Sequence, residues 1–87
     1  MKGRALVAWN LRRLRVDQLM SQDKLAADAS VDRAYLGGLE RQAENPTIDL
    51  LDKIAEALRV PLSELFVQPE DGAKPPPILT GGRKKKT

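Results

Sequence analysis

The sequence predicts an all-α domain of five short helices over residues 3–67, followed by a flexible tail over residues 68–87. Apolar residues recur at helical spacing in the five segments, and no segment shows a convincing strand pattern. Beyond residue 67 the chain becomes rich in proline, glycine and charge, a composition that does not support a packed core. A chain of 87 residues is expected to form one domain.

The first three helices are predicted from their caps and inner faces. The first is expected over residues 3–19, with an apolar stripe at i, i+4 and i+7 that consists of Val7, Leu11 and Leu14. The second begins at Ser21, whose hydroxyl can cap its first turn, and its inner face holds Leu25, Ala26 and Ala29. The third has Asp32 as its N-cap, with Leu36 and Leu39 facing inward.

Proline marks the start of the last two helices. Because a proline disfavours helix at the residue before it, Asn45-Pro46 is a break, and Thr47 then caps the fourth helix. The apolar residues of this helix recur at i, i+3, i+4 and i+7 and are Leu51, Ile54, Ala55 and Leu58. Pro61 opens the short fifth helix, whose apolar residues are Leu62, Leu65 and Phe66.

The composition argues against several kinds of chemistry. The chain has no cysteine and no histidine, so neither a transition-metal site nor the commonest general base is expected. We therefore predict a protein that is not an enzyme and has no cofactor. No apolar run is long enough to span a membrane and no signal peptide is recognisable, so the expected location is cytoplasmic, without membrane contact.

The net charge of +3 is unevenly distributed along the chain. Basic residues are concentrated in the first helix and in residues 83–86, whereas the fourth and fifth helices are more acidic. A basic half beside an acidic half fits a polyanionic partner on one face. Residues 83–86 are expected to be a flexible, solubilising end, with non-specific DNA contact as the alternative.

Five dipeptides occur at the spacing of a known family. They are Ser21-Gln22, Leu25-Ala26, Glu40-Arg41, Asn45-Pro46 and Ala57-Leu58. Over residues 7–66 the chain resembles the phage-repressor-like helix-turn-helix family, the xenobiotic-response-element class of bacterial regulators. The resemblance implies a five-helix, lambda-repressor-like DNA-binding domain. The function it implies is that of a transcriptional regulator that binds a palindromic operator in double-stranded DNA as a homodimer, through the major groove.

The resemblance also implies which residues contact DNA. The third helix is the recognition helix, and the residues implied as base contacts are Arg33, Ala34, Gly37 and Gly38. The fork of the Arg33 guanidinium matches guanine O6 and N7, and the Ala34 methyl suits a thymine methyl. The implied phosphate contacts are Gln22, Tyr35, Arg41 and Asn45. For Tyr35 a packing role is an equal alternative.

A partly buried ion pair between Arg15 and Glu40 is implied as well, and it would fix the third helix against the first. Arg12 and Arg13 are expected to form a solvated face, with a binding patch as the alternative. Trp9 is expected at a partly covered edge of the core, with a subunit or partner contact as the alternative. The cluster of the fifth helix, Leu62, Leu65 and Phe66, is expected to be mostly core, and its exposed part could form the dimer interface.

The chain departs from the family pattern at two turns and within the third helix. Ser30 and Gln42 stand where the family usually has glycine in a conformation with positive φ. Gly37 and Gly38 lie inside the third helix, where each costs about 0.8–1 kcal/mol relative to alanine. Their missing side chains leave either lower sequence specificity or a closer approach of the backbone to DNA.

A second class of function stays open at this point. An antitoxin with this fold would bind a toxin partner and also its own promoter. Residues 75–87 would then be the toxin-binding segment that becomes ordered on binding. For a regulator without a separate effector domain, direct contact with RNA polymerase is a further possible interaction.

Overall fold

The computed structural model describes residues 1–77, so residues 78–87, including the basic residues 83–86, lie outside the described part. The element order is α1 (Gly3–Asp17), α2 (Gln22–Ala29), α3 (Arg33–Glu40), α4 (Ile48–Leu58) and the 3-10 helix η1 (Leu62–Phe66). The predicted all-α fold is confirmed, and residues 1–77 contain no strand. The fifth helix is a short 3-10 helix and not an α-helix.

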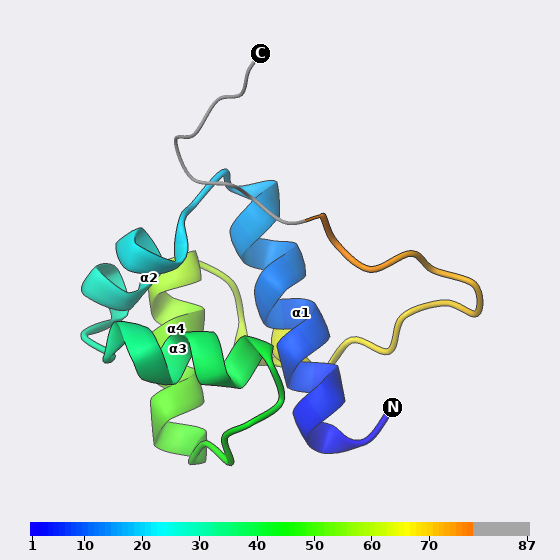
Figure 1. Cartoon of the computed structure of the whole chain (residues 1–87), viewed down its shortest axis with the longest axis horizontal. Coiled ribbons are helices and arrows are strands. Elements are labelled where there is room, and N and C mark those ends of the chain that lie inside the picture. Colours follow the sequence, from blue (N-terminus) through cyan, green and yellow to red (C-terminus); the bar gives the residue numbers. More distant parts are fainter. Residues whose placement is uncertain (78–87) are drawn as a thin grey trace.

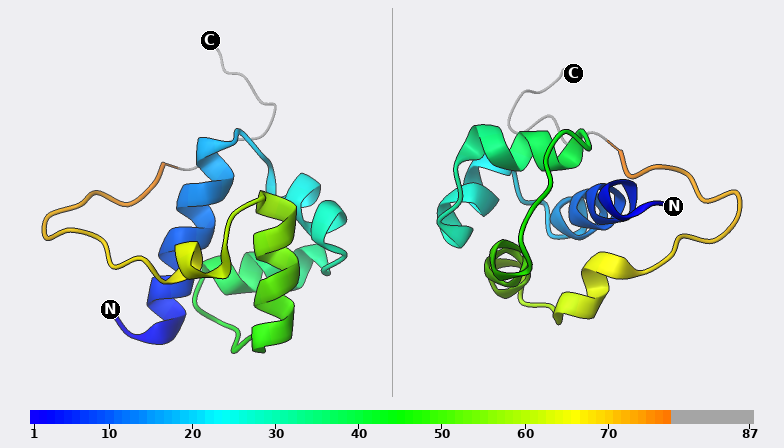
Figure 2. Two further views of the ribbon diagram at one scale, coloured as in Figure 1. Left: turned by 180° about the vertical axis from the view of Figure 1, so that it is seen from behind. Right: turned by 90° about the horizontal axis from the view of Figure 1, so that it is seen from below.

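The helices surround one core to which every element contributes. α1 packs against α3 and η1, while α2 packs against α3 and α4, and α4 also contacts η1 (Figure 1). The fully buried apolar side chains are Leu11, Leu25, Leu36, Ile54, Leu58 and Leu65. In the view from below, α3 lies on the side of the molecule opposite η1 (Figure 2). α3 is therefore a peripheral helix with one face on the core and one face outward.

The three side-chain caps predicted from the sequence are present at the starts of α2, α3 and α4. Ser21 Oγ accepts the backbone N–H of Lys24 at 3.0 Å. Asp32 and Thr47 cap α3 and α4 in the same way, each accepting the N–H three residues later at 3.1 Å. These bonds satisfy backbone donors that have no partner within their helix, and so they define where each helix begins.

Each of the four α-helices within residues 1–77 is followed by a residue with positive φ that is not glycine. These residues are Leu19, Ser30, Gln42 and Arg59, with φ between 55° and 64°. In each case the next N–H bonds to the carbonyl five residues before it, as in a Schellman turn. The prediction for Ser30 and Gln42 is thereby confirmed. Because Leu19 is left-handed, α1 ends at Asp17, two residues before the predicted end.

A buried asparagine joins η1 to α1. Asn10 is fully buried, and its Nδ2 donates to the carbonyl oxygens of Leu65 at 3.1 Å and Val67 at 2.9 Å. Its Oδ1 accepts from Arg13 Nη2 at 2.9 Å, and the same nitrogen donates to the carbonyl of Glu64 at 3.0 Å. The expectation that Arg13 is only solvated is therefore wrong, because its guanidinium holds η1 in place.

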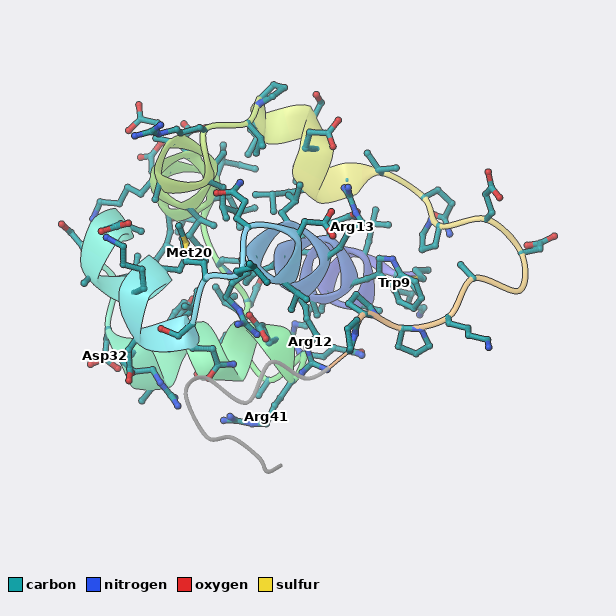
Figure 3. All side chains as sticks on the ribbon, turned by 90° about the horizontal axis from the view of Figure 1, so that it is seen from above. Trp9, Arg12, Arg13, Met20, Asp32 and Arg41 are labelled. Atoms are coloured by element: carbon teal, nitrogen blue, oxygen red, sulfur yellow. The ribbon has the colours of Figure 1, made fainter. Side chains whose placement is uncertain are left out.

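The described part of the predicted tail, residues 68–77, contains no helix or strand. It leaves η1 and returns to α1, where Pro75 and Pro76 lie near Trp9 (Figures 1 and 3). These residues line a cavity of about 320 Å³ that also includes Arg12. Trp9 is half-buried. Within residues 1–77 it is not among the partly buried apolar side chains that pack against the core, so the expected place at the edge of the core is not supported. None of the helices within residues 1–77 is long and apolar enough to cross a membrane.

Candidate nucleic-acid interface

The orientation of α3 is set by a buried ion pair at its C-terminal end. Arg15 Nε donates to Glu40 Oε2 at 2.6 Å and Arg15 Nη2 donates to Glu40 Oε1 at 2.9 Å. The side chains are only 5% and 0% exposed. The bidentate geometry joins α1 to α3 with a fixed direction. The structure thus contains the Arg15–Glu40 pair that the family resemblance implied.

Two further side chains donate to the same carboxylate. Arg12 Nε lies 3.3 Å from Glu40 Oε1, and Gln22 Nε2 donates to the same oxygen at 3.1 Å. Arg12 therefore does not belong to a purely solvated face, which corrects the expectation from the sequence. Gln22 is the first residue of α2, so Glu40 ties three helices together at one point.

The environment of Glu40 favours its ionised form. Burial by itself raises the pKa of this carboxyl group, because it removes the charge from water. The hydrogen bonds and charge of Arg15, followed by the hydrogen bonds from Gln22 and Arg12, outweigh that effect. The pKa of Glu40 consequently lies below its ordinary value, and the network is charged at neutral pH.

The outer face of α3, together with Arg41 directly after it, carries two arginines and an alanine. Leu36 and Leu39 point into the core and are almost completely buried. The helical period then places Arg33, Ala34 and Arg41 outward, and the structure leaves all three exposed. Figure 3 shows Asp32 and Arg41 at opposite ends of the helix, with Arg41 projecting away from α1. The open face is thus basic at both ends.

Three side chains converge over the backbone of Gly37. A Cβ atom built on Gly37 would lie 3.2 Å from Arg41 Nη1 and 3.3 Å from Arg33 Nη1. It would also lie 3.8 Å from Gln22 Oε1. The missing side chain of Gly37 therefore leaves the space that the two guanidinium groups occupy. We call Arg33 and Arg41, with the neighbouring Gln22, the basic cluster; it lies directly over the backbone of Gly37.

Arg33 is held from the side by an acidic residue of α2. Its Nε lies 3.0 Å from Asp23 Oδ1, and the two side chains are 54% and 82% exposed. An ion pair this exposed contributes little to stability, about 0–1 kcal/mol. Its importance lies in orientation, because a pair through Nε restricts the plane and direction of the guanidinium.

Gly38 does not have the environment that we expected of a base contact. A Cβ atom built there would lie 2.8 Å from Glu44 Cγ and 2.9 Å from Glu44 Oε2. The side chain of Glu44, from the loop between α3 and α4, therefore fills the space beside Gly38. This glycine faces the loop and not the open side of the helix, which argues against the predicted base contact of Gly38.

The predicted phosphate contacts differ in their accessibility. Gln22 and Arg41 belong to the basic cluster over Gly37, and Asn45 is exposed in the loop after α3. Tyr35 is half-buried and packs against the core, which favours the packing alternative for its ring. The contact of these residues with phosphate stays a prediction.

The predicted dimer interface is only partly exposed. Leu65 is fully buried, so its assignment to an interface is wrong: it belongs to the core of the subunit. Leu62 is half-buried against the same core. Phe66 is 39% exposed and Val67, which the sequence analysis did not single out, is 43% exposed.

Within residues 1–77 no group of three or more acidic, histidine or cysteine side chains could hold a metal ion.

Sequence reasoning missed Asp23 and Glu44 as neighbours of the outer face, and Asn10 as the anchor of η1. The acidic residues looked like ordinary solvated positions on helix and loop surfaces. A single polar residue in the apolar part of a helix, as Asn10 is, was the one available signal for a buried network.

Comparison with known proteins identifies relatives for most of the described part. The profile of a family described as helix-turn-helix matches residues 11–65. A hypothetical transcription factor of Neisseria meningitidis is 35% identical over 71 residues, which cover 82% of this chain and 67% of that protein.

Solved structures show the same fold. The restriction-modification controller protein C.AhdI from Aeromonas hydrophila superimposes with a TM-score of 0.71 at 36% identity, covering 72% of this chain and 96% of that one. The controller protein C.Esp1396I, solved as a tetramer with its natural 35-base-pair operator, gives a TM-score of 0.70 at 30% identity. It covers 76% of this chain and 87% of that chain.

Proposed function

This chain belongs to the helix-turn-helix family, and on that premise we propose that it is a transcriptional regulator that binds double-stranded DNA sequence-specifically. The observation that carries the proposal is the exposed face of α3, with Arg33, Ala34 and Arg41 outward above a buried ion pair. A helix with one free basic face on a rigid support has the shape and charge to enter a major groove. The proposed role is binding and not catalysis.

The residues on and beside α3 then have distinct proposed roles. Arg33 donates to guanine O6 and N7, and Ala34 contacts a thymine methyl group. Gln22, Arg41 and Asn45 bind phosphate groups on either side of the groove, where they set position and affinity without selecting sequence.

We further propose that the protein acts as a homodimer on a palindromic operator. The relative C.Esp1396I was solved as a tetramer with its operator, which makes self-association a reasonable expectation for this chain. Phe66 and Val67 supply exposed apolar surface on η1 and just beyond it, on the side opposite α3. An interface there leaves the outer face of α3 open. Two recognition helices would then contact half-sites about 34 Å apart, which is one turn of DNA.

The test is to select duplexes that the purified protein binds from a random pool at low salt, and to measure the mass of the free and bound protein. We expect an enriched sequence with two-fold symmetry and a mass of two chains on DNA. A pool without enrichment, or no binding to any duplex, would refute the proposed function. Enrichment of a sequence without symmetry, bound by one chain, would refute only the dimer.

Arg33→Ala provides the residue-level test on the selected duplex. We expect a loss of about 1–3 kcal/mol in binding free energy and relaxed preference at one base pair. The same loss on every duplex would make Arg33 a phosphate contact. Arg59→Ala is a suitable control, because Arg59 follows α4 and its exposed side chain lies beside Gln18 and Glu56, away from the residues of α3.

A further inference from the structure

We propose that Asp23 is a specificity-determining residue. Its carboxylate binds Arg33 Nε and keeps the guanidinium over Gly37, so that the two Nη groups of Arg33 face a single guanine. The inference rests on the proposed DNA-binding function and adds a residue of α2 to the group that selects the base. It comes from three observations: the Asp23–Arg33 contact, the space above Gly37, and the position of Arg41.

The first step concerns the geometry of the contact. Asp23 Oδ1 pairs with Arg33 Nε at 3.0 Å, and therefore leaves both Nη groups of the guanidinium available. Recognition of guanine O6 and N7 needs two parallel donors with a fixed separation. An arginine that is already held by one edge loses less rotational freedom when it binds, so its preference for the correct base increases.

The second step concerns the surface on which Arg33 lies. Arg33 Nη1 and Arg41 Nη1 are 3.3 Å and 3.2 Å from the position where Gly37 would carry a Cβ. Two guanidinium groups that both lie near Gly37 repel each other, and a nearby negative charge reduces this repulsion. Asp23 supplies that charge in the free protein. In the complex Arg41 is directed to the neighbouring phosphate, and Arg33 keeps Asp23 as its partner.

The third step concerns the sign of the effect on binding. The carboxylate of Asp23 is 82% exposed beside the proposed DNA face, where it repels phosphate groups. Asp23 therefore weakens non-specific binding, while it strengthens the choice of guanine. Substitution of a residue with only a structural role would not raise the affinity for non-specific DNA while lowering the preference for guanine.

The experiment compares Asp23→Asn with Asp28→Asn, which removes the same charge from the same helix. Asp28 pairs with Lys24 at 3.1 Å and lies near Lys53 and Glu56 of α4, on the side of α2 away from Arg33. The probes are the duplex selected by the unaltered protein, the same duplex with the contacted guanine replaced, and an unrelated duplex. Equilibrium affinities are measured at one fixed salt concentration.

For Asp23→Asn we expect about twofold to threefold tighter binding to the unrelated duplex, and a preference for guanine that falls about tenfold. For Asp28→Asn we expect the preference to stay within about twofold of the unaltered protein. In the Arg33→Ala background, Asp23→Asn should no longer change the preference, because the two substitutions remove the same interaction.

An unchanged guanine preference in Asp23→Asn would overturn the inference, and so would an equal fall in Asp28→Asn. An additive effect of Asp23→Asn in the Arg33→Ala background would also overturn it. Each of these results leaves the proposed function intact, provided that the unaltered protein still prefers its selected duplex. Failure of the unaltered protein to prefer any sequence would instead refute the function on which the inference rests.

Discussion

Arg15 of α1 and Glu40 of α3 form a bidentate ion pair in which neither side chain is more than 5% exposed. The pair lies at the C-terminal end of α3, the element with the proposed base contacts. Gln22, a proposed phosphate contact, donates to the same carboxylate at 3.1 Å. Stability and DNA binding consequently share one network, and substitutions in it should affect both.

Arg15→Ala should lower the free energy of unfolding by about 2–4 kcal/mol, because it leaves the buried Glu40 carboxylate without its main partner. Urea denaturation at neutral pH measures this loss. The double variant Arg15→Met with Glu40→Leu is the control, since it removes both charges and should recover part of the loss. A loss below about 0.5 kcal/mol in Arg15→Ala would show that the pair does not support α3.

The lowered pKa of Glu40 predicts a defined dependence of stability on pH. The pKa of Glu40 is lowered in the folded state. Such a carboxyl group stabilises the fold at pH values above the pKa that it has in the unfolded chain, which is about 4.3. That contribution is lost as the pH falls through the lower, folded value. Glu40→Gln should therefore be less stable than the unaltered protein at pH 7, and the difference should shrink below about pH 4.3.

Urea denaturation of both proteins between pH 7 and pH 3.5 tests this dependence. Asp49→Asn is a useful comparison, because Asp49 is exposed in the first turn of α4. A difference between Glu40→Gln and the unaltered protein that stays constant over this range would contradict the ionised network around Glu40.

The left-handed residue after α1 allows a test of backbone strain. Leu19 has a φ of 55° and is 80% exposed, so its side chain contributes little packing while its backbone is strained. We expect Leu19→Gly to be more stable than Leu19→Ala by about 1 kcal/mol, because only glycine adopts this conformation without cost. Thermal unfolding of the two variants measures the difference. Equal stability of the two variants would mean that the backbone at residue 19 is not strained.

The helices could be predicted from the sequence because their signals are local. Ser21, Asp32 and Thr47 each stand just before an amphipathic segment, and the structure shows each of them as a cap. The positive φ of Ser30 and Gln42 was predictable only because the family has glycine there. Leu19 and Arg59 adopt the same conformation without any such signal, since neither residue type favours it.

The site was less predictable because it depends on contacts between elements. The sequence indicated that Arg33 and Gly37 are on the recognition helix, but not that Gly37 provides the space for two guanidinium groups. Gly38, its neighbour, has a different environment because one residue is a rotation of about 100° around the helix. The amphipathic pattern of η1 did not show how much of Leu65 would be buried.

Gly37→Ala should increase stability and decrease specific DNA binding. Alanine is favoured over glycine inside a helix by about 1 kcal/mol, and the atoms nearest the new methyl group are the mobile ends of Arg33 and Arg41. These ends can move aside in the free protein, so the variant retains the stabilisation from the higher helix propensity of alanine. On DNA the displaced guanidinium groups lose their positions, and affinity for the selected duplex should fall about tenfold. Thermal unfolding and equilibrium binding measure the two effects.

Gly38→Ala is the matched control for helix propensity. Its methyl group would contact Glu44 Cγ at 2.8 Å, within the loop and not over the basic cluster. Glu44 would have to shift, which offsets the gain in propensity, while affinity for the selected duplex should change by less than about threefold. If Gly38→Ala weakened specific binding as much as Gly37→Ala, the loss would reflect a general displacement of α3. The cluster over Gly37 would then not be the source of specificity.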